Sequence, residues 1–304
     1  MSRRSFLARS VIACALFTCT VGFALAKAQA APVAVPSATA ARFTADVRGQ
    51  GPDVILIPGL GSSASVWDAT ARQLEGRYRV HVLQVAGFAG AAPGANAEGP
   101  VVEPLVEAVD AYIRAKGLKA PAVIGHSMGG LTGLMLARRH PADVGRLMIV
   151  DSLPFYGVLF GPGVTVEAVR PQATMVRDAT IAMAADAFAA QQAMTMPRLV
   201  RSPEGQAAAV AWSIASDRKV FSQAFYDVLT TDMRGEVAAI TTPTTMLYPL
   251  DTTAGQTAET VNPIYTTAYA PLKGVRLARI DDARHFIMLD QPAAFAAQVE
   301  QFLQ

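Results

Sequence analysis

Residues 121–133 read PAVIGHSMGGLTG, and this stretch decides how the rest of the chain is interpreted. A short apolar run meets GHSMG (residues 125–129), and apolar residues at helical spacing follow it. The pattern predicts a strand, a tight turn and a helix, with Ser127 at the apex of the turn. Gly125 and Gly129 have no Cβ, so they leave room for a serine in strained backbone geometry. The hydroxyl would then lie at a helix start, where free N–H groups favour developing negative charge.

Apolar runs and amphipathic patterns alternate along most of the chain, which predicts a mostly parallel, doubly wound α/β sheet with helices on both faces. Continuous apolar runs such as residues 53–57 are typical of strands that are buried on both sides. The expected strands are residues 42–47, 53–57, 78–85, 122–124, 146–150, 244–250 and 275–280. The expected helices between them include residues 66–74, 101–116, 131–137, 262–269 and 292–303.

The alternation is interrupted between residues 154 and 235, where no convincing strand pattern occurs. Helical stretches are expected there instead, and several prolines separate them. This divides the chain into an α/β core (residues 42–153 and 236–304) and an inserted helical cap (residues 154–235). The cap is rich in methionine and aromatic side chains, most of which are expected to pack between its helices, while a few line an apolar pocket.

The first 30 residues have the pattern of an export signal. SRRSFL (residues 2–7) resembles a twin-arginine motif, an apolar run follows, and Ala28-Gln29-Ala30 is a small-x-small cleavage pattern. The apolar run is shorter than the ~20 residues that span a bilayer, so no stable membrane anchor is expected. A lipoprotein signal ending at Cys14 is the alternative, although apolar sequence continues beyond that cysteine. Residues 31–41 are expected to form a disordered leader.

Cleavage near Ala30 would place the mature protein in the periplasm or outside the cell and change its composition. Both cysteines, Cys14 and Cys19, lie in the signal, so neither a disulfide nor a cysteine metal site is expected. Four of the 26 basic residues also lie there, which leaves 22 against 24 acidic residues and changes the formal net charge from +2 to −2. No dense basic patch remains, and binding to nucleic acid is not expected.

A serine hydroxyl needs a base to become a nucleophile, and the chain has four histidines. His126 directly precedes Ser127 and should point away from its hydroxyl. His81 lies inside an expected strand, and His140 ends a helix. His285 lies in a loop after a strand, which is where open α/β sheets place their chemistry. His285 is therefore the predicted general base.

The base needs a carboxylate that orients it, and two aspartates are candidates. Asp251 follows the strand at residues 244–250 and lies between Ser127 and His285, in the chain order Ser, Asp, His. Asp151 follows the strand after the serine helix and is the alternative. We favour Asp251. For the oxyanion, the backbone N–H of Met128 is one predicted donor and that of Leu60 the other, with Gly61 as the fallback.

Together these residues resemble the α/β-hydrolase family over essentially all of residues 42–304. GHSMGG (residues 125–130) is similar to its nucleophile elbow, and ILIPGLGSSASVW (residues 55–67) to its oxyanion loop and first helix. ARHFIMLDQPAAFAAQVEQFL (residues 283–303) is similar to its terminal histidine segment and last helix. Pro58 stands where many members have histidine. The resemblance implies a Ser-His-Asp hydrolase with a helical cap and neither a metal nor an organic cofactor.

These features predict an exported serine hydrolase, with Ser127, His285 and Asp251 as catalytic residues and Leu60 and Met128 as the oxyanion hole. The expected substrate is a small, apolar carboxylic ester or lactone, hydrolysed through an acyl-enzyme. Two other classes stay open from the sequence. One is a lyase or perhydrolase that uses the same triad, and the other is a protein that binds small molecules on this fold without turnover.

Overall fold

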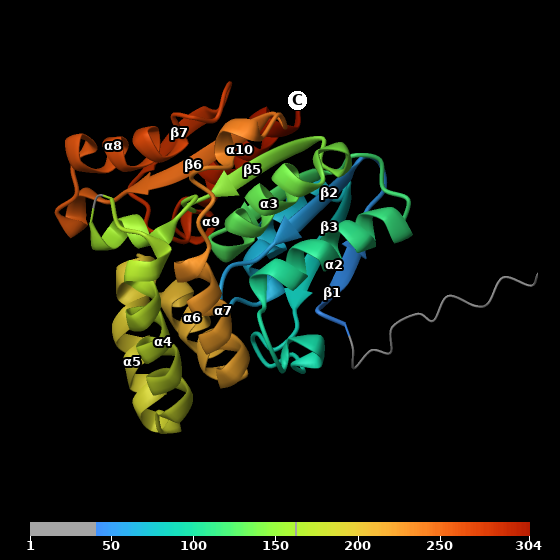
Figure 1. Cartoon of the computed structure of the whole chain (residues 1–304). Helices are drawn as coiled ribbons and strands as arrows, with labels where there is room; N and C mark the ends of the chain where they lie inside the picture. Colours follow the sequence, from blue (N-terminus) through green and yellow to red (C-terminus); the bar gives the residue numbers. More distant parts are fainter. Residues whose placement is uncertain (1–40, 162) are drawn as a thin grey trace, which may run out of the picture. The chain divides into compact units, whose positions relative to one another are not determined.

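The computed structural model describes residues 41–161 and 163–304 of the chain, and Figure 1 shows the arrangement of its helices and strands. The predicted signal segment and nearly all of the predicted leader lie outside the described residues. Seven strands form one sheet in the order β1-β3-β2-β4-β5-β6-β7. β1 pairs antiparallel with β3 at the edge, and every other neighbouring pair is parallel. The predicted α/β class with a mostly parallel sheet is confirmed.

The strands agree closely with the apolar runs of the sequence. They are β1 (Phe43–Arg48), β2 (Asp53–Ile57), β3 (Arg79–Val85), β4 (Ala122–His126), β5 (Arg146–Val150), β6 (Thr244–Leu250) and β7 (Arg276–Asp281). The helices packed on them are α1 (Asp68–Leu74), α2 (Val102–Ala115), α3 (Met128–Arg139), α8 (Ala258–Tyr269), α9 (Ile287–Asp290) and α10 (Pro292–Leu303).

Helices cover both faces of the sheet because strand side chains alternate between two separate apolar clusters. In β2, Ile55 and Ile57 pack with residues of α2, α3 and α8, whereas Val54 and Leu56 pack with residues of α1 and α10. All four side chains are fully buried. A strand buried on both faces gains hydrophobic stabilisation from every residue, which explains why its sequence is a continuous apolar run. The edge strand β1, in contrast, is half exposed and alternates.

Among the described residues, the segment between residues 154 and 235 contains helices and no strand. Its four α-helices are α4 (Val166–Ala182), α5 (Ala185–Leu199), α6 (Pro203–Ala215) and α7 (Arg218–Thr230), preceded by the 3-10 helix η5 (Tyr156–Phe160). They group together to one side of the sheet (Figure 1). One of the prolines does not separate two helices, since α4 contains Pro171 and continues to Ala182. Proline has no N–H, so α4 lacks the backbone hydrogen bond that residue 171 would otherwise donate to the carbonyl of residue 167.

No helix among the described residues is both long enough and apolar enough to span a bilayer.

Candidate active site

Ser127 lies at the turn between β4 and α3, in strained backbone geometry with φ 53° and ψ −118°. The two glycines of the turn are required by close backbone contacts. A Cβ on Gly125 would lie 2.1 Å from the carbonyl oxygen of Gly129, and a Cβ on Gly129 would lie 2.3 Å from that of Ile57. The backbone N–H of Ser127 donates to Val150 of β5 (2.9 Å), which attaches the turn to the sheet. The strained serine is thus held by the core of the fold.

The sheet places His285 and Asp151 together, although 134 positions separate them in the chain. Asp151 directly follows β5, and His285 lies in the loop between β7 and α9. The His285 Nδ1 lies 2.6 Å from the Asp151 Oδ2. This contact leaves Nε2 as the ring nitrogen free to act on a neighbour. Ser127, Asp151 and His285 all border one cavity. No hydrogen bond joins Ser127 to His285 in the described part of the chain, and such bonds often shorten only when substrate binds.

The preference for Asp251 as the partner of His285 is wrong. Asp251 is 1% exposed and is occupied elsewhere: its Oδ1 accepts from the backbone N–H and hydroxyl of Thr253 (3.0 and 2.6 Å). Its Oδ2 accepts from the Arg284 guanidinium at 2.6 Å. Burial alone would raise the pKa of Asp251, but the hydrogen bonds from Thr253 and Arg284 outweigh it and hold the pKa below its usual value. The carboxylate is thus charged and fully engaged by Thr253 and Arg284.

Two local features explain why Asp151 takes the contact. Its backbone has a positive φ of 44°, which is rare outside glycine, and the strand before it is anchored in the sheet. Tyr265 of α8 donates its hydroxyl to the other carboxylate oxygen of Asp151 (2.5 Å). Burial and the negative charge of Asp151 raise the pKa of Tyr265 well above its usual value, so the phenol remains a donor. Tyr265 belongs to an amphipathic helix and carries no sequence signal for this role.

His126 contacts His285 and positions it, and is not itself the base for Ser127. Its Nε2 donates to the backbone carbonyl of His285 (3.0 Å), and the two rings lie 4.5 Å apart between centroids. The ring of Phe286 packs against His126 at 4.7 Å. Complete burial and the neighbouring His285 lower the pKa of His126 well below its usual value. A neutral His126 therefore holds the backbone of His285 without adding a charge beside it.

Tyr156 of η5 is a further polar residue near the predicted active site, and sequence reasoning gave it no role there. It borders the cavity, and its hydroxyl donates to the Ser152 hydroxyl (3.2 Å). Burial raises the pKa of Tyr156 to about 12, against hydrogen bonds with Ser152 and Ser127 that lower it. The phenol is thus protonated at neutral pH and, like Ser127, borders the cavity.

The loop after β2 lies directly against the serine turn. A Cβ on Gly59 would lie 2.8 Å from the Nδ1 of His126 and 3.1 Å from the Cβ of Ser127, so glycine is needed for this approach. Leu60 follows at the cavity wall, and Met128 begins α3 and is fully buried. The backbone N–H groups of Leu60 and Met128 donate to no other group within residues 41–161 and 163–304. Gly61, the fallback donor, accepts a hydrogen bond at its carbonyl from Ser216 of the cap (3.4 Å).

The cavity above these residues has a volume of about 670 Å³ and lies between the sheet and the cap. Most side chains around it are apolar, and those of the cap come from η5 and all four cap α-helices. Of the methionine and aromatic residues of the cap, those that line it include Tyr156, Phe160, Met196, Phe221 and Phe225. Phe155, Phe188 and Met233 are buried and do not line the cavity, whereas Met175 and Met194 are exposed. A cavity of this size accommodates a small organic ligand.

A comparison with protein families identifies the fold. A sequence model described as "Alpha/beta hydrolase family" matches residues 54–298, most of the chain. The chain belongs to the alpha/beta hydrolase family.

Individual relatives of this alpha/beta hydrolase are distant. It is 26% identical over 200 residues to a pimeloyl-[acyl-carrier protein] methyl ester esterase of Aliivibrio fischeri, covering 66% of this chain and 75% of the relative. A hydrolase from Pseudomonas aeruginosa has a similar structure, with a TM-score of 0.71, 21% identity and coverage of 88% of this chain and 97% of that chain. The enol-lactonase from Burkholderia xenovorans has a TM-score of 0.68 at 21% identity, covering 86% and 96%. The two structures establish likeness of fold.

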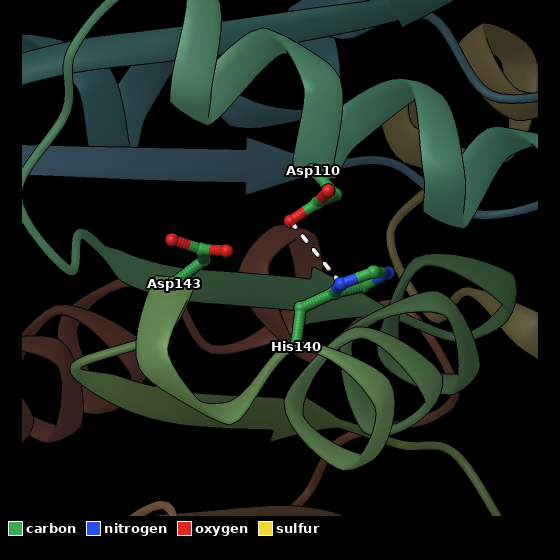
Figure 2. A group of neighbouring side chains, drawn as sticks. All are labelled: Asp110, His140 and Asp143. Carbon is green, nitrogen blue, oxygen red and sulfur yellow. Dashed lines mark ion pairs between the residues drawn. The ribbon is translucent and has the colours of Figure 1, made fainter.

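A second polar cluster on this alpha/beta hydrolase lies on α2 and after α3, away from the residues that line the cavity. Asp110, His140 and Asp143 bring ligand atoms to within 4.8 Å of one another (Figure 2). Arg114 lies 3.1 Å from both Asp110 and Asp143, so its guanidinium offsets part of their negative charge. His140 is partly buried and paired with Glu107 (3.1 Å) and Asp110 (3.4 Å). This arrangement is an ion-pair network that joins α2 to the end of α3.

Proposed function

We propose that this alpha/beta hydrolase is a carboxylesterase that hydrolyses small, uncharged esters or lactones through an acyl-enzyme. One observation carries the proposal: the strained Ser127 borders the same apolar cavity as a histidine whose Nδ1 is held by a carboxylate. That arrangement is the one a serine nucleophile requires. The esterase named among the relatives supports the same reaction class.

In the proposed reaction, Nε2 of His285 takes the proton of Ser127 as the serine oxygen attacks the ester carbonyl. Asp151 holds the ring in the tautomer that leaves Nε2 unprotonated, and it stabilises the imidazolium that forms. The N–H groups of Leu60 and Met128 are the proposed donors to the tetrahedral oxyanion. The imidazolium then protonates the departing alcohol, the carbon–oxygen bond to that alcohol breaks, and an acyl-Ser127 remains.

Water then hydrolyses the acyl-enzyme, and His285 and the oxyanion hole act in this step as in the first. His285 takes a proton from the water as its oxygen attacks the acyl carbon, and a second tetrahedral intermediate forms in the oxyanion hole. Ser127 leaves with the proton that His285 returns, and the carboxylic acid is released. The protonated Tyr156, which borders the same cavity, adds a neutral polar group there, which is suited to an uncharged ester.

Covalent labelling tests the proposed nucleophile. We expect a fluorophosphonate probe to add once per chain at Ser127, located by mass spectrometry of peptides, with loss of p-nitrophenyl ester turnover in proportion to labelling. Prior incubation with a slowly hydrolysed ester should delay the labelling. A protein that turns over esters but is labelled elsewhere, or not at all, would contradict the proposal.

We also propose that the chain is exported by the twin-arginine route and cleaved near Ala30. SRRSFL, the apolar run after it and the Ala28-Gln29-Ala30 pattern support this proposal. The N-terminus of protein recovered from the periplasm should be close to Ala31. Changing Arg3 and Arg4 together to lysine should retain the uncleaved chain in the cytoplasm. Periplasmic protein that still begins at Met1 would count against cleavage.

A further inference from the structure

Three polar side chains of the cap face the cavity without a hydrogen-bond partner among the described residues. Thr180 of α4, Gln192 of α5 and Ser213 of α6 are 7%, 5% and 2% exposed, and all three line the cavity. We call these three residues the cap subsite. Because these three side chains border the cavity, their polar groups are available to hydrogen-bond a ligand in it.

Gln192 is the most informative of the three. It lies one turn before Met196 on the face of α5 that borders the cavity. Neither its amide oxygen nor its amide nitrogen is hydrogen-bonded within residues 41–161 and 163–304, yet neither is sealed from a water-sized sphere. Since the residue is almost wholly buried and lines the cavity, its amide must face the cavity. A side chain of this length that only filled space would be apolar.

The subsite is connected to the proposed oxyanion loop through Phe221 of α7. A Cβ on Gly61 would lie 2.7 Å from the ring of Phe221, so the ring packs closely against this glycine. The Ser213 hydroxyl lies 3.6 Å from the same Cβ position. Phe188, one turn before Gln192 on α5, packs edge-on against Phe221 with centroids 5.6 Å apart. Ser213 and the Gln192 face of α5 therefore border the same aromatic ring. A ligand that reaches Ser127 along the cavity can meet both.

We propose that the cap subsite binds an uncharged hydrogen-bonding group of the substrate, and that a secondary amide is the class that fits it best. This inference rests on the proposed esterase function of the same cavity. A secondary amide has one donor and one acceptor, which the oxygen and nitrogen of the Gln192 amide complement, and the two hydroxyls can serve either group. The three side chains are neutral, so they offer no charge to a carboxylate or an ammonium.

Two matched ester series test the subsite and locate the amide. The first contains p-nitrophenyl esters of N-acylglycine, N-acyl-β-alanine and N-acyl-γ-aminobutyrate, each compared with the alkanoate of equal chain length. The second places the same amides in the alcohol part, with acid release followed by pH-stat. We expect at least one amide ester in one series to have a kcat/KM equal to or above that of its alkanoate match.

Gln192→Met removes the amide at similar length. It should lower kcat/KM for that amide ester roughly tenfold, the loss of one neutral hydrogen bond, and leave the matched alkanoate unchanged or faster. Gln192→Leu is the second variant in case the first does not fold, and Gln301→Leu on the exposed face of α10 is the control. Equal losses on amide and alkanoate esters would overturn the subsite. Failure of the proposed function would differ, because the unmodified protein would then hydrolyse neither series.

Discussion

Changing Ser127 to alanine is expected to lower kcat for ester hydrolysis by about 10⁶-fold, because it removes the proposed nucleophile that forms the acyl-enzyme. The variant should keep its fold, since alanine tolerates the same positive φ as serine does and the turn depends on its glycines. Initial rates with a p-nitrophenyl ester, under conditions where the probe labels unmodified protein, measure the loss.

Ser65→Ala is the matched control for the loss of a hydroxyl. Ser65 is exposed, lies in the same region as the proposed oxyanion loop and does not line the cavity. The Ser65→Ala variant should hydrolyse the ester at the same rate as the unmodified protein. If the Ser127→Ala protein is folded and keeps more than a few per cent of the turnover, another nucleophile acts and the proposed mechanism is wrong.

Changing Asp151 to asparagine is expected to lower kcat by about 10⁴-fold. An asparagine can present its amide N–H₂ to Nδ1 of His285, and the ring would then carry its proton on Nε2, where a base needs a lone pair. Steady-state kinetics of folded protein measures the loss. A residual rate that rises with pH as hydroxide replaces the base would agree with the same explanation.

Comparing Asp251→Asn with Asp151→Asn decides which aspartate is the functional partner of His285. The expected effect of Asp251→Asn on kcat is less than about tenfold, but the substitution removes the charge that Arg284 contacts in a buried position. The free energy of unfolding should fall by about 1.5–3 kcal/mol, the range for hydrogen bonds with a charged partner. Urea unfolding of the variant and of the unmodified protein measures this decrease in the free energy of unfolding. A folded Asp251→Asn protein that loses as much kcat as Asp151→Asn would reverse the assignment of the acid.

The contrast between the two aspartates shows where the sequence was insufficient. Both directly follow parallel strands, and both precede His285 in the chain, so spacing favours neither on physical grounds. The difference lies in their partners: Tyr265 holds Asp151, whereas Arg284 and Thr253 hold Asp251. One signal was available, because the guanidinium of Arg284, directly before the histidine, needs a carboxylate if it is partly buried.

For the cap, too, the sequence predicted the helices but not which of their side chains line the cavity. Helical periodicity predicted that residues 154–235 are helical, because an amphipathic helix needs only local spacing to be recognised. Which of its side chains meet the cavity depends on how the helices rotate against one another and against the sheet. Met196 and Gln192 therefore line the cavity, while Met194, between them in the sequence, is 74% exposed.

The sequence by itself determined the strands, the serine turn and the loop position of His285, because each depends on residues that are neighbours in the chain. Continuous apolar runs predict buried strands, and two glycines around Ser127 predict the turn. Only the tertiary structure decided that Asp151 is the partner of His285 and that Gln192 faces the cavity. Both depend on contacts between distant segments, where burial makes each polar group compete for a few partners at short range. Local spacing carries no information about the outcome of that competition.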